Sequence, residues 1–466
     1  MPEPIKTLLV TDVPFWQNAT GAHARILDLL KGVGAAENQE AGFDLSILAT
    51  CTETGGGAGP AEVAGFPVEK VDLSQPPRLG WASRLSWCFR AILNSLGWLP
   101  KRPAPQSRQI DHWYSPELLQ RIVEQIRLAD PDIILFEYLN QTQVLRALPD
   151  SLRRSTVMVL DSHDILWKRN QAFQQRGEEH WLDIDRQQEE AALREFDLVI
   201  AIQPSERDYF VSVVGESRVI ETAMEMEGSG LDARGLHPER SETADHVAGP
   251  MLGDFKGQSK QGLPDQITGR EARLAEGATK PGIRVGFLGS DNRPNQDCLR
   301  RILNLWPELF KRNPRLRLSL AGSICDRIEL LEPFRSLEGV EILGRLESLE
   351  DFYCRLQVVW NPVTFGTGLK IKNLEALAHG VGLVTTCHGV EGFAEPGNDR
   401  EAPSGTGILL AETDAELLDL FSGLDLDLSE QLGEEGIEFV RKRFGKGTQY
   451  PALRRKLRAL FSEKSW

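Results

Sequence analysis

Short apolar runs take turns with stretches of helical periodicity in this 466-residue chain, and this alternation restricts the fold more than any other feature. The runs that predict strands are Ile5 to Thr11, Ile133 to Tyr138, Thr156 to Leu160 and Leu198 to Ile202, and the helical stretches are Gly21 to Leu30, 117–128 and 180–195. Strands that alternate with helices form parallel sheets with crossover helices. We therefore expect an α/β fold with a Rossmann-like domain over residues 1–221.

A second set of strand-like runs begins near residue 282. Residues 282–445 are predicted to form a second Rossmann-like domain, and residues 446–466 a C-terminal helix that packs back on the first domain. Between the two domains, residues 222–281 are rich in Gly, Ser, Ala, Asp and Glu, with Phe255 as the only aromatic residue. Such a segment buries little apolar surface, so we expect a polar linker or inserted loop, with disorder as one option.

The composition argues against several classes of protein. The formal net charge of −15 disfavours general nucleic-acid binding, which needs clustered cations to neutralise phosphates. The six cysteines are scattered without C-x-x-C spacing, so we expect neither a zinc site nor a disulfide framework. The N-terminus lacks the features of a signal peptide, and no apolar run is long enough to span a membrane. We expect a cytoplasmic protein without a metal or cofactor.

The strongest site pattern lies in residues 361–380, where a glycine-broken loop runs into a predicted helix. Gly366 and Gly368 allow the backbone to approach a ligand closely, and the free N–H groups at the start of the helix favour anionic oxygen. Lys370 and Lys372 add positive charge at the same place. The loop and the helix together predict a site for a diphosphate.

Glu375 extends this pattern toward a nucleoside. It follows Lys372 by three residues, about one turn along the same helix face, where a carboxylate could accept both hydroxyls of a ribose. The simpler alternative is a surface helix with one Lys/Glu pair, closed by Gly380 at its C-terminal end.

The string from Gly366 to Gly380 resembles the nucleotide-sugar motif of the group 1 glycosyltransferases, in the sub-pattern G-T-G-L-K-x-K-x-L-E-A-x-A-x-G. That family has the GT-B fold, in which two Rossmann-like domains face each other across a cleft. The resemblance implies a nucleoside diphosphate sugar as donor. The donor-binding residues that it implies in this motif are Gly366, Thr367, Gly368, Lys370, Lys372 and Glu375.

The resemblance extends over residues 282 to about 395. Ile283 to Ser290 is similar to the first strand and glycine turn of the family's C-terminal domain, and Val340 to Arg345 is similar to the short strand and loop that pack near the nucleobase. It therefore also implies Gly289, Gly344 and Arg345 at the donor site.

The first domain carries a second site pattern, Leu160-Asp-Ser-His-Asp-Ile-Leu-Trp-Lys-Arg169. A predicted strand ends at Leu160, and parallel sheets bind ligands beyond the carboxyl ends of their strands, so His163 and Asp164 should face the cleft. The alternative is that these polar residues only cap a loop or the next helix. The pattern resembles the D-x-H-D-x-x-x-x-R element in the acceptor-side domain of bacterial group 1 transferases.

Two further residues are expected on the acceptor side. Thr20 to Arg25 is similar to the family's loop after the first strand, in which a glycine lets backbone N–H groups reach the donor phosphate or the acceptor. That glycine is Gly21, and Ala22 stands where a second glycine is common. The other residue is Arg169, which could orient the preceding His-Asp pair.

The resemblance implies sugar transfer to a hydroxyl of a glycan or lipid-linked acceptor, with retained anomeric configuration and without a metal ion. Lys372, and after it Lys370, would stabilise the charge on the departing diphosphate. Glu375 would hold the ribose. His163 or Asp164 would position the acceptor hydroxyl or polarise the sugar.

One position departs from the family pattern. Many relatives have a glutamate eight residues before the ribose glutamate, and Thr367 stands there instead. No acid of this motif then contacts the transferred sugar, so the identity of the sugar stays open. Two other functions also stay open, a nucleotide-sugar epimerase of GT-B fold and a catalytically silent binding subunit.

Residues 76–110 form a basic amphipathic segment in an otherwise acidic chain. From Leu73 to Ile110 there are six cations and no acidic residue. The apolar residues that recur at spacings of three and four are Trp81, Leu85, Phe89, Ile92, Leu96 and Leu99. This stripe could pack on its own domain, or it could contact lipid and hold the protein peripherally on the inner face of a membrane.

Overall fold

The computed structural model describes residues 3–17, 21–35, 42–50, 60–70, 108–228, 282–366, 368–393 and 404–464. Most of the basic amphipathic segment, the linker after residue 228, and Thr367 lie outside these ranges, so the predictions made for them are not addressed. Within the described ranges, no helix is both long and apolar enough to cross a membrane.

The first half of the molecule is built on a sheet whose described strands have the order β3-β4-β2-β1-β5-β6-β7-β8. Their bounds are β1 (Ile5–Thr11), β2 (Phe43–Ala49), β3 (Glu62–Val63), β4 (Phe66–Lys70), β5 (Ile133–Glu137), β6 (Val157–Asp161), β7 (Leu198–Ala201) and β8 (Val219–Glu221). Neighbouring strands are parallel except β3 and β4. Strands β5, β6 and β7 are buried along their whole length, which explains their continuous apolar sequences.

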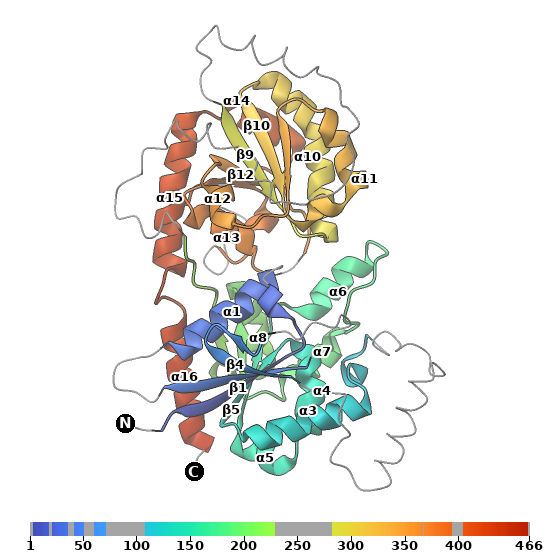
Figure 1. Ribbon diagram of the computed structural model, residues 1–466, viewed down its shortest axis with the longest axis vertical. Coiled ribbons are helices and arrows are strands. Elements are labelled where there is room, and N and C mark those ends of the chain that lie inside the picture. Colours follow the sequence, from blue (N-terminus) through green and yellow to red (C-terminus); the bar gives the residue numbers. More distant parts are fainter. Residues whose placement is uncertain are drawn as a thin grey trace, which may run out of the picture.

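Helices pack on this sheet and bury its two faces (Figure 1). They are α1 (Gly21–Gly34), α3 (Pro116–Ala129), α4 (Thr142–Ala147), α5 (Asp150–Ser155), α6 (Leu166–Gln174), α7 (Arg186–Leu193) and α8 (Pro204–Val214). Alternate residues of β5 belong to separate cores, with Phe136 in one and Leu135 in the other. The start of helix α3 is stabilised by Ser115, whose side-chain oxygen accepts a hydrogen bond from the backbone N–H of Leu118.

The second half has a fully parallel sheet in the order β11-β10-β9-β12-β13-β14. Its strands are β9 (Ile283–Leu288), β10 (Leu316–Ala321), β11 (Val340–Gly344), β12 (Val358–Asn361), β13 (Gly382–Thr385) and β14 (Ile408–Leu410). The helices are α10 (Arg293–Arg312), α11 (Ile328–Leu331), α12 (Leu349–Tyr353), α13 (Ile371–Ala378), α14 (Asp414–Gly423) and α15 (Leu426–Phe444). The predicted α/β fold with two Rossmann-like halves is confirmed.

The chain returns to the first half at its C-terminal end. Helix α16 (Tyr450–Lys464) follows α15 and runs alongside the first half (Figure 1). The ring of Tyr450 lies so close to Gly32 of α1 that a Cβ atom on Gly32 would approach it to 2.1 Å. At the other end of α16, Lys464 forms an ion pair of 2.6 Å with Asp197.

Side chains of the two halves meet at the carboxyl edge of the first sheet. The ring of Phe365 lies 6.2 Å from the ring of Phe173. The guanidinium of Arg176 stacks on the ring of Phe365, 3.8 Å from its centroid. Arg293 of the second half is 3.1 Å from Glu178 of the first. These contacts join the end of α6 and the segment after it to the loop that precedes α13 and to the start of α10.

Candidate active site

His163 lies just beyond the carboxyl end of β6, where the sequence predicts a site residue. It has a φ of 62°, in the left-handed region that side-chain-bearing residues seldom adopt. Its imidazole stacks on the ring of Tyr138 with the ring centroids 4.0 Å apart. A strained backbone and a stacked ring together fix the orientation of the side chain.

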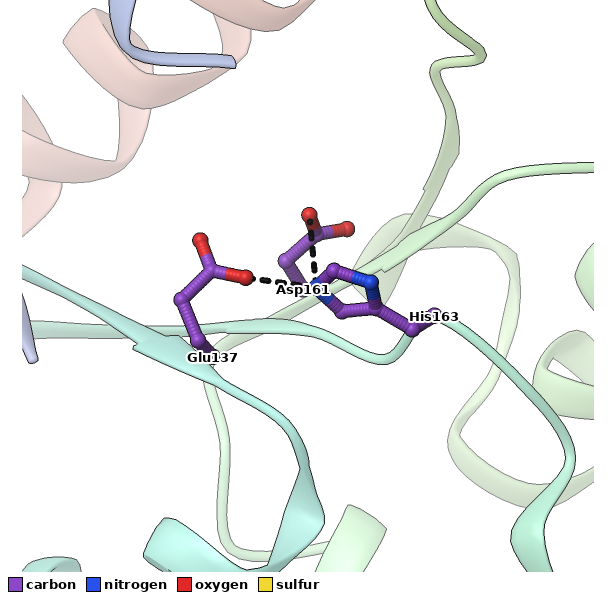
Figure 2. Close-up of side chains that lie close together, drawn as sticks. All are labelled: Glu137, Asp161 and His163. Carbon is purple, nitrogen blue, oxygen red and sulfur yellow. Dashed lines mark hydrogen bonds and ion pairs between the residues drawn. The ribbon is translucent and has the colours of Figure 1, made fainter. Parts of the chain in front are cut away.

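Two buried carboxylates face one nitrogen of this imidazole (Figure 2). The Nε2 atom of His163 lies 2.6 Å from Glu137 at the end of β5 and 3.6 Å from Asp161 at the end of β6. Burial by itself lowers the pKa of His163, but the negative charges of Asp161 and Glu137 and the hydrogen bond to Glu137 outweigh it. The pKa of His163 is therefore raised above its ordinary value.

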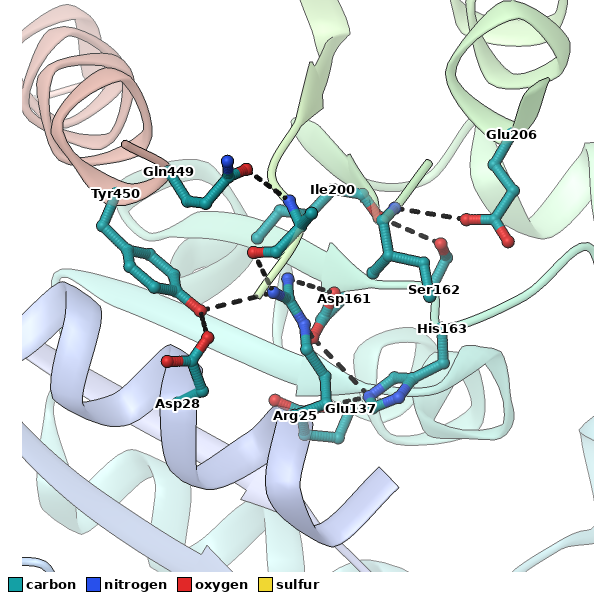
Figure 3. A network of polar contacts seen from close by, with 12 residues as sticks. Arg25, Asp28, Glu137, Asp161, Ser162, His163, Ile200, Glu206, Gln449 and Tyr450 are labelled. Carbon is teal, nitrogen blue, oxygen red and sulfur yellow. Dashed lines mark hydrogen bonds and ion pairs between the residues drawn. The ribbon is translucent and has the colours of Figure 1, made fainter. Parts of the chain in front are cut away.

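Arg25 of α1 completes this group. Its guanidinium donates two hydrogen bonds to the two oxygens of Asp161, at 2.9 and 3.1 Å. It also donates to the carbonyl oxygen of Ala223 at 2.8 Å and to the hydroxyl of Tyr450 at 3.3 Å (Figure 3). Arg25 thus joins the strand that ends beside His163 to the places where the chain leaves and re-enters the first half.

Asp164, the second predicted residue of the pair, faces the other half of the molecule. Its Oδ2 atom accepts a hydrogen bond of 2.5 Å from Arg169, as the expected orienting role requires. Its Oδ1 atom is buried and has no hydrogen-bond partner among the described residues. A Cβ atom on Gly368 would lie 2.9 Å from that oxygen, so the carboxylate is directed at the glycine loop.

Lys370 binds the glycine loop itself. Its ammonium group donates to the carbonyl oxygens of Gly366 and Gly368, at 3.4 and 2.7 Å, and lies 3.8 Å from Glu391. Burial lowers the pKa of Lys370, and the carboxylates of Glu391 and Asp164 act against this. Both glycines have a positive φ, 108° for Gly366 and 80° for Gly368, which accounts for their place in the motif.

Lys372 reaches in another direction. Its ammonium group donates to the side-chain oxygen of Asn295 at 2.7 Å and to the carbonyl of Leu288 at 3.2 Å, and lies 4.9 Å from the ring centre of Phe287. Burial lowers the pKa of Lys372 to about 8. The structure therefore brings this cation to the end of β9 and the start of α10, and does not pair it with Glu375.

Glu375 lies on the same helix and is partly exposed. Its carboxylate accepts a hydrogen bond of 3.3 Å from the hydroxyl of Tyr353 at the end of α12. Burial raises the pKa of Glu375 above its ordinary value. The carboxylate can therefore accept further hydrogen bonds from the hydroxyls of a ligand.

The remaining predicted residues differ in how close they lie to Lys372 and Glu375. Gly21 begins α1, and a Cβ atom there would lie 3.1 Å from Ile371 of α13. Gly289 is packed between β9 and α10, and Gly344 ends β11 with a φ of 75°. Arg345 is exposed and pairs with Asp326 at 2.6 Å, and no described contact joins it to Lys372 or Glu375.

Sequence reasoning did not single out Glu137, Asp161 or Arg25 as site residues. One ligand atom from each of Glu137, Asp161 and His163 lies within 4.8 Å of the others, a spacing that a metal ion can use. Both oxygens of Asp161, however, already accept hydrogen bonds from the Arg25 guanidinium. A buried organic cation thus occupies the position, and the group fits a charge network better than a metal site.

Comparisons with known proteins agree with this geometry. Residues 282–419 match the family model described as glycosyl transferases group 1, which covers most of the second half. No curated protein sequence matches the chain.

Solved structures resemble the chain over nearly its whole length. HepE of Anabaena, solved with UDP and glucose, is 14% identical with a TM-score of 0.57, and the alignment covers 98% of this chain and 99% of that one. Sucrose-phosphate synthase of Thermosynechococcus elongatus is 16% identical with a TM-score of 0.61, over 98% and 100% of the two chains. The lipopolysaccharide outer core galactosyltransferase WaaB is 10% identical with a TM-score of 0.50, over 98% and 99%. At these identities the likeness shows the fold, and the predicted GT-B arrangement is confirmed.

Proposed function

We propose that this glycosyltransferase moves a sugar from a nucleoside diphosphate to a hydroxyl group of a glycan or lipid-linked acceptor. One observation carries the proposal. The unpaired oxygen of Asp164 in the first half faces Gly368, the residue that leads into the Lys370, Lys372 and Glu375 helix of the second half. The two site patterns of the sequence therefore lie next to each other.

The second half supplies the groups that suit a nucleoside diphosphate. Lys372 places its cation at the end of β9 and the start of α10, and Lys370 places its own at the glycine loop before α13. The positive end of the dipole of this eight-residue helix also favours anionic oxygen. Departure of the diphosphate builds up negative charge, and fixed cations stabilise it without a metal ion. Glu375, with Tyr353 behind it, would accept the ribose hydroxyls.

The first half supplies the groups that act on the sugar and the acceptor. A buried carboxylate oxygen without a partner, such as Oδ1 of Asp164, costs about 1–3 kcal/mol, and a substrate hydroxyl that donates to it removes this cost. Arg169 holds the other oxygen and so fixes the direction of the free one. We assign Asp164 to a hydroxyl of the substrate, and we expect retention of the anomeric configuration, as in the family that the motif resembles.

UDP-linked hexoses are the first donors to test, because HepE was solved with UDP-glucose and WaaB is a galactosyltransferase. Thermal unfolding of the full chain should be followed with UDP-glucose, UDP-galactose and the corresponding GDP sugars. A ligand at 100 times its dissociation constant adds about 2.7 kcal/mol of stability. If no nucleotide sugar at millimolar concentration raises the melting temperature, the donor site is wrongly assigned.

His163→Ala then tests whether the halves make one active site. The affinity for nucleotide should stay nearly unchanged, because the residues assigned to nucleotide binding lie in the second half. The rate of sugar transfer should fall by roughly 10²-fold or more. EDTA should leave the rate unaltered. Turnover of the donor in the absence of an acceptor would instead indicate the epimerase alternative.

A role in cell-surface glycan synthesis would bring the protein to a membrane, and the basic amphipathic segment is our proposal for that contact. Serine at Trp81, Phe89 and Leu96 should reduce binding to vesicles of phosphatidylglycerol and leave nucleotide binding intact. If the parent protein does not bind such vesicles, the segment has no membrane role.

A further inference from the structure

His163 belongs to a buried group with Glu137, Asp161 and Arg25 at the carboxyl edge of the first sheet, and the hydroxyl of Tyr450 links Arg25 to Asp28. Glu137 comes from β5, Asp161 from β6, Arg25 from α1 and His163 from the turn after β6 (Figure 3). Glu137 and Asp161 are fully buried, Arg25 is 1% exposed and His163 is 6% exposed. Water therefore contributes little to the charge balance, and the four groups must largely balance one another.

The balance of charges within this buried group sets the protonation state of Glu137 and His163. Arg25 is always positive and neutralises Asp161 through its two hydrogen bonds. Glu137 then remains as a second buried acid, and its Oε1 atom has no partner among the described residues. With a neutral imidazole and an ionised Glu137, the group would carry an uncompensated negative charge, which is costly inside a protein. One further proton, shared along the 2.6 Å contact between Glu137 and His163, removes that charge.

We propose that Glu137 and Asp161 are positioning residues that keep His163 as an imidazolium, so that it serves the reaction as a fixed hydrogen-bond donor and cation and not as a base. The kinetic consequence rests on the glycosyl transfer proposed above. The protonation state itself does not.

The two nitrogens of the ring have separate tasks in this arrangement. Nε2 is taken up by the carboxylates, and Figure 2 shows the other nitrogen on the far side of the ring from them. That atom, Nδ1, has no hydrogen-bond partner among the described residues. In an imidazolium it carries a proton that can be donated to a substrate oxygen. The positive φ of His163 and its stacking on Tyr138 hold this donor in one direction.

The other groups that face His163 do not supply the proton. Burial raises the pKa of the Tyr138 hydroxyl, which stays neutral. Asp164 is ion-paired with Arg169 and directed at Gly368. With His163 as donor, the free oxygen of Asp164 is the remaining acceptor for a substrate hydroxyl among these residues.

Nuclear magnetic resonance of protein with ¹⁵N-labelled histidine tests the protonation state without any substrate. The resonances of His163 are assigned by their loss in His163→Gln. In the parent, both ring nitrogens should carry protons at pH 7. In Glu137→Gln, where one carboxylate is lost, the ring should become neutral at pH 7 and gain its second proton only at lower pH. A neutral His163 in the parent at pH 7, or the same titration in both proteins, overturns the proposal.

Kinetics supply a second measurement, on the full chain and with the donor that the thermal screen identifies. Glu137→Gln should lower kcat by about 10²-fold at pH 7, in line with the loss of one preorganised electrostatic group, and leave the KM for the donor nearly unchanged. Activity should recover as the pH is lowered, whereas a merely structural defect would not. Glu137→Asp keeps the charge and should restore most of kcat.

Glu189→Gln is the matched control for loss of a buried glutamate. Glu189 is 1% exposed and accepts hydrogen bonds from the backbone of Leu166 and Trp167, and no described hydrogen bond or ion pair joins it to His163. This variant should leave the His163 resonances and the pH profile unchanged. If it shifts the pH profile as much as Glu137→Gln does, the effect is not specific to Glu137 and the proposal fails.

Discussion

The Oδ1 atom of Asp164 and the α-carbon of Gly368 face each other across the two halves of the molecule, with room for a hydrogen atom on Gly368 but not for a methyl group. Asp164 belongs to the turn after β6, and Gly368 lies 204 residues further along the chain, three residues before α13. The close approach of the two halves at the candidate site therefore depends on one glycine.

Gly368→Ala should keep both halves folded and impair transfer. A Cβ atom would lie 2.9 Å from the Asp164 oxygen, and the φ of 80° adds strain of about 1–3 kcal/mol. We expect kcat/KM to fall by at least roughly tenfold, because a misplacement of about 1 Å at a reaction centre has large effects. Gly177→Ala is the control, since Gly177 has a similar φ of 71° and no atom near its absent Cβ. Equal losses in the two variants would show that backbone strain alone is responsible.

The lowered pKa of Lys372 predicts that nucleotide binding is coupled to proton uptake. Its pKa of about 8 in the free protein is depressed, and a bound diphosphate should raise it by opposite charge. At pH 8.5 binding should therefore take up part of a proton, and affinity should weaken as pH rises above 8. Calorimetry of UDP binding in two buffers of different ionisation enthalpy measures this uptake. Lys372→Met should abolish it, and uptake that persists in that variant would assign the linkage to another group.

The same shift has a consequence for stability in the absence of nucleotide. In the unfolded chain Lys372 keeps its proton up to its ordinary pKa of 10.5, whereas in the folded chain its pKa is about 8. The destabilising contribution of Lys372 is therefore complete below pH 8 and decreases as pH rises toward 10.5.

Glu375→Gln should weaken nucleotide binding without unfolding the protein. Hydrogen bonds to a charged group contribute about 1.5–3 kcal/mol, so the dissociation constant of UDP should rise by roughly 10- to 100-fold. The comparison that isolates the ribose uses 2′-deoxy-UDP, for which parent and variant should differ less. If UDP and its deoxy analogue lose affinity equally, Glu375 does not contact the ribose.

Arg25→Met should be the most destabilising of the single substitutions considered. It leaves Asp161 buried without its partner, and breaking a buried ion pair in this way costs about 3–5 kcal/mol. The double variant Arg25→Met, Asp161→Asn removes the stranded charge and should regain part of the loss. Thermal unfolding of both proteins measures the difference. A double variant less stable than the single one would contradict the charge argument.

The fold, and the positions of the candidate site residues on it, could be predicted from the sequence because both depend on local patterns. Strand β5 is one residue shorter than the apolar run Ile133 to Tyr138 that predicts it. The glycine loop leads into α13 just after Lys370, as the motif predicts. Strand β13 (Gly382–Thr385), which lies between β12 and β14 and is four residues long, was not predicted.

The partners of His163 could not be found in the same way. Glu137 ends a strand that lies 26 residues earlier, and Arg25 sits on a helix 136 residues before Asp161. In a sequence these are an ordinary strand-end glutamate and a helical arginine. Only the parallel order of β5 and β6, with α1 packed above them, turns them into one buried group. Lys372 shows the same limit, because its spacing from Glu375 predicts a helix pair and folding directs it to Asn295 instead.

The return of α16 to the first half makes that half discontinuous in the chain, and this affects how the protein can be made. Tyr450 fills the space above Gly32, and Gln449 donates and accepts hydrogen bonds around residues 223 and 225. During synthesis the first half thus stays incomplete until α16 has left the ribosome, whereas residues 282–444 can pack earlier. A truncation after residue 445 would remove none of the side chains that we assign to nucleotide binding, yet the half that it leaves incomplete is the one at the N-terminus.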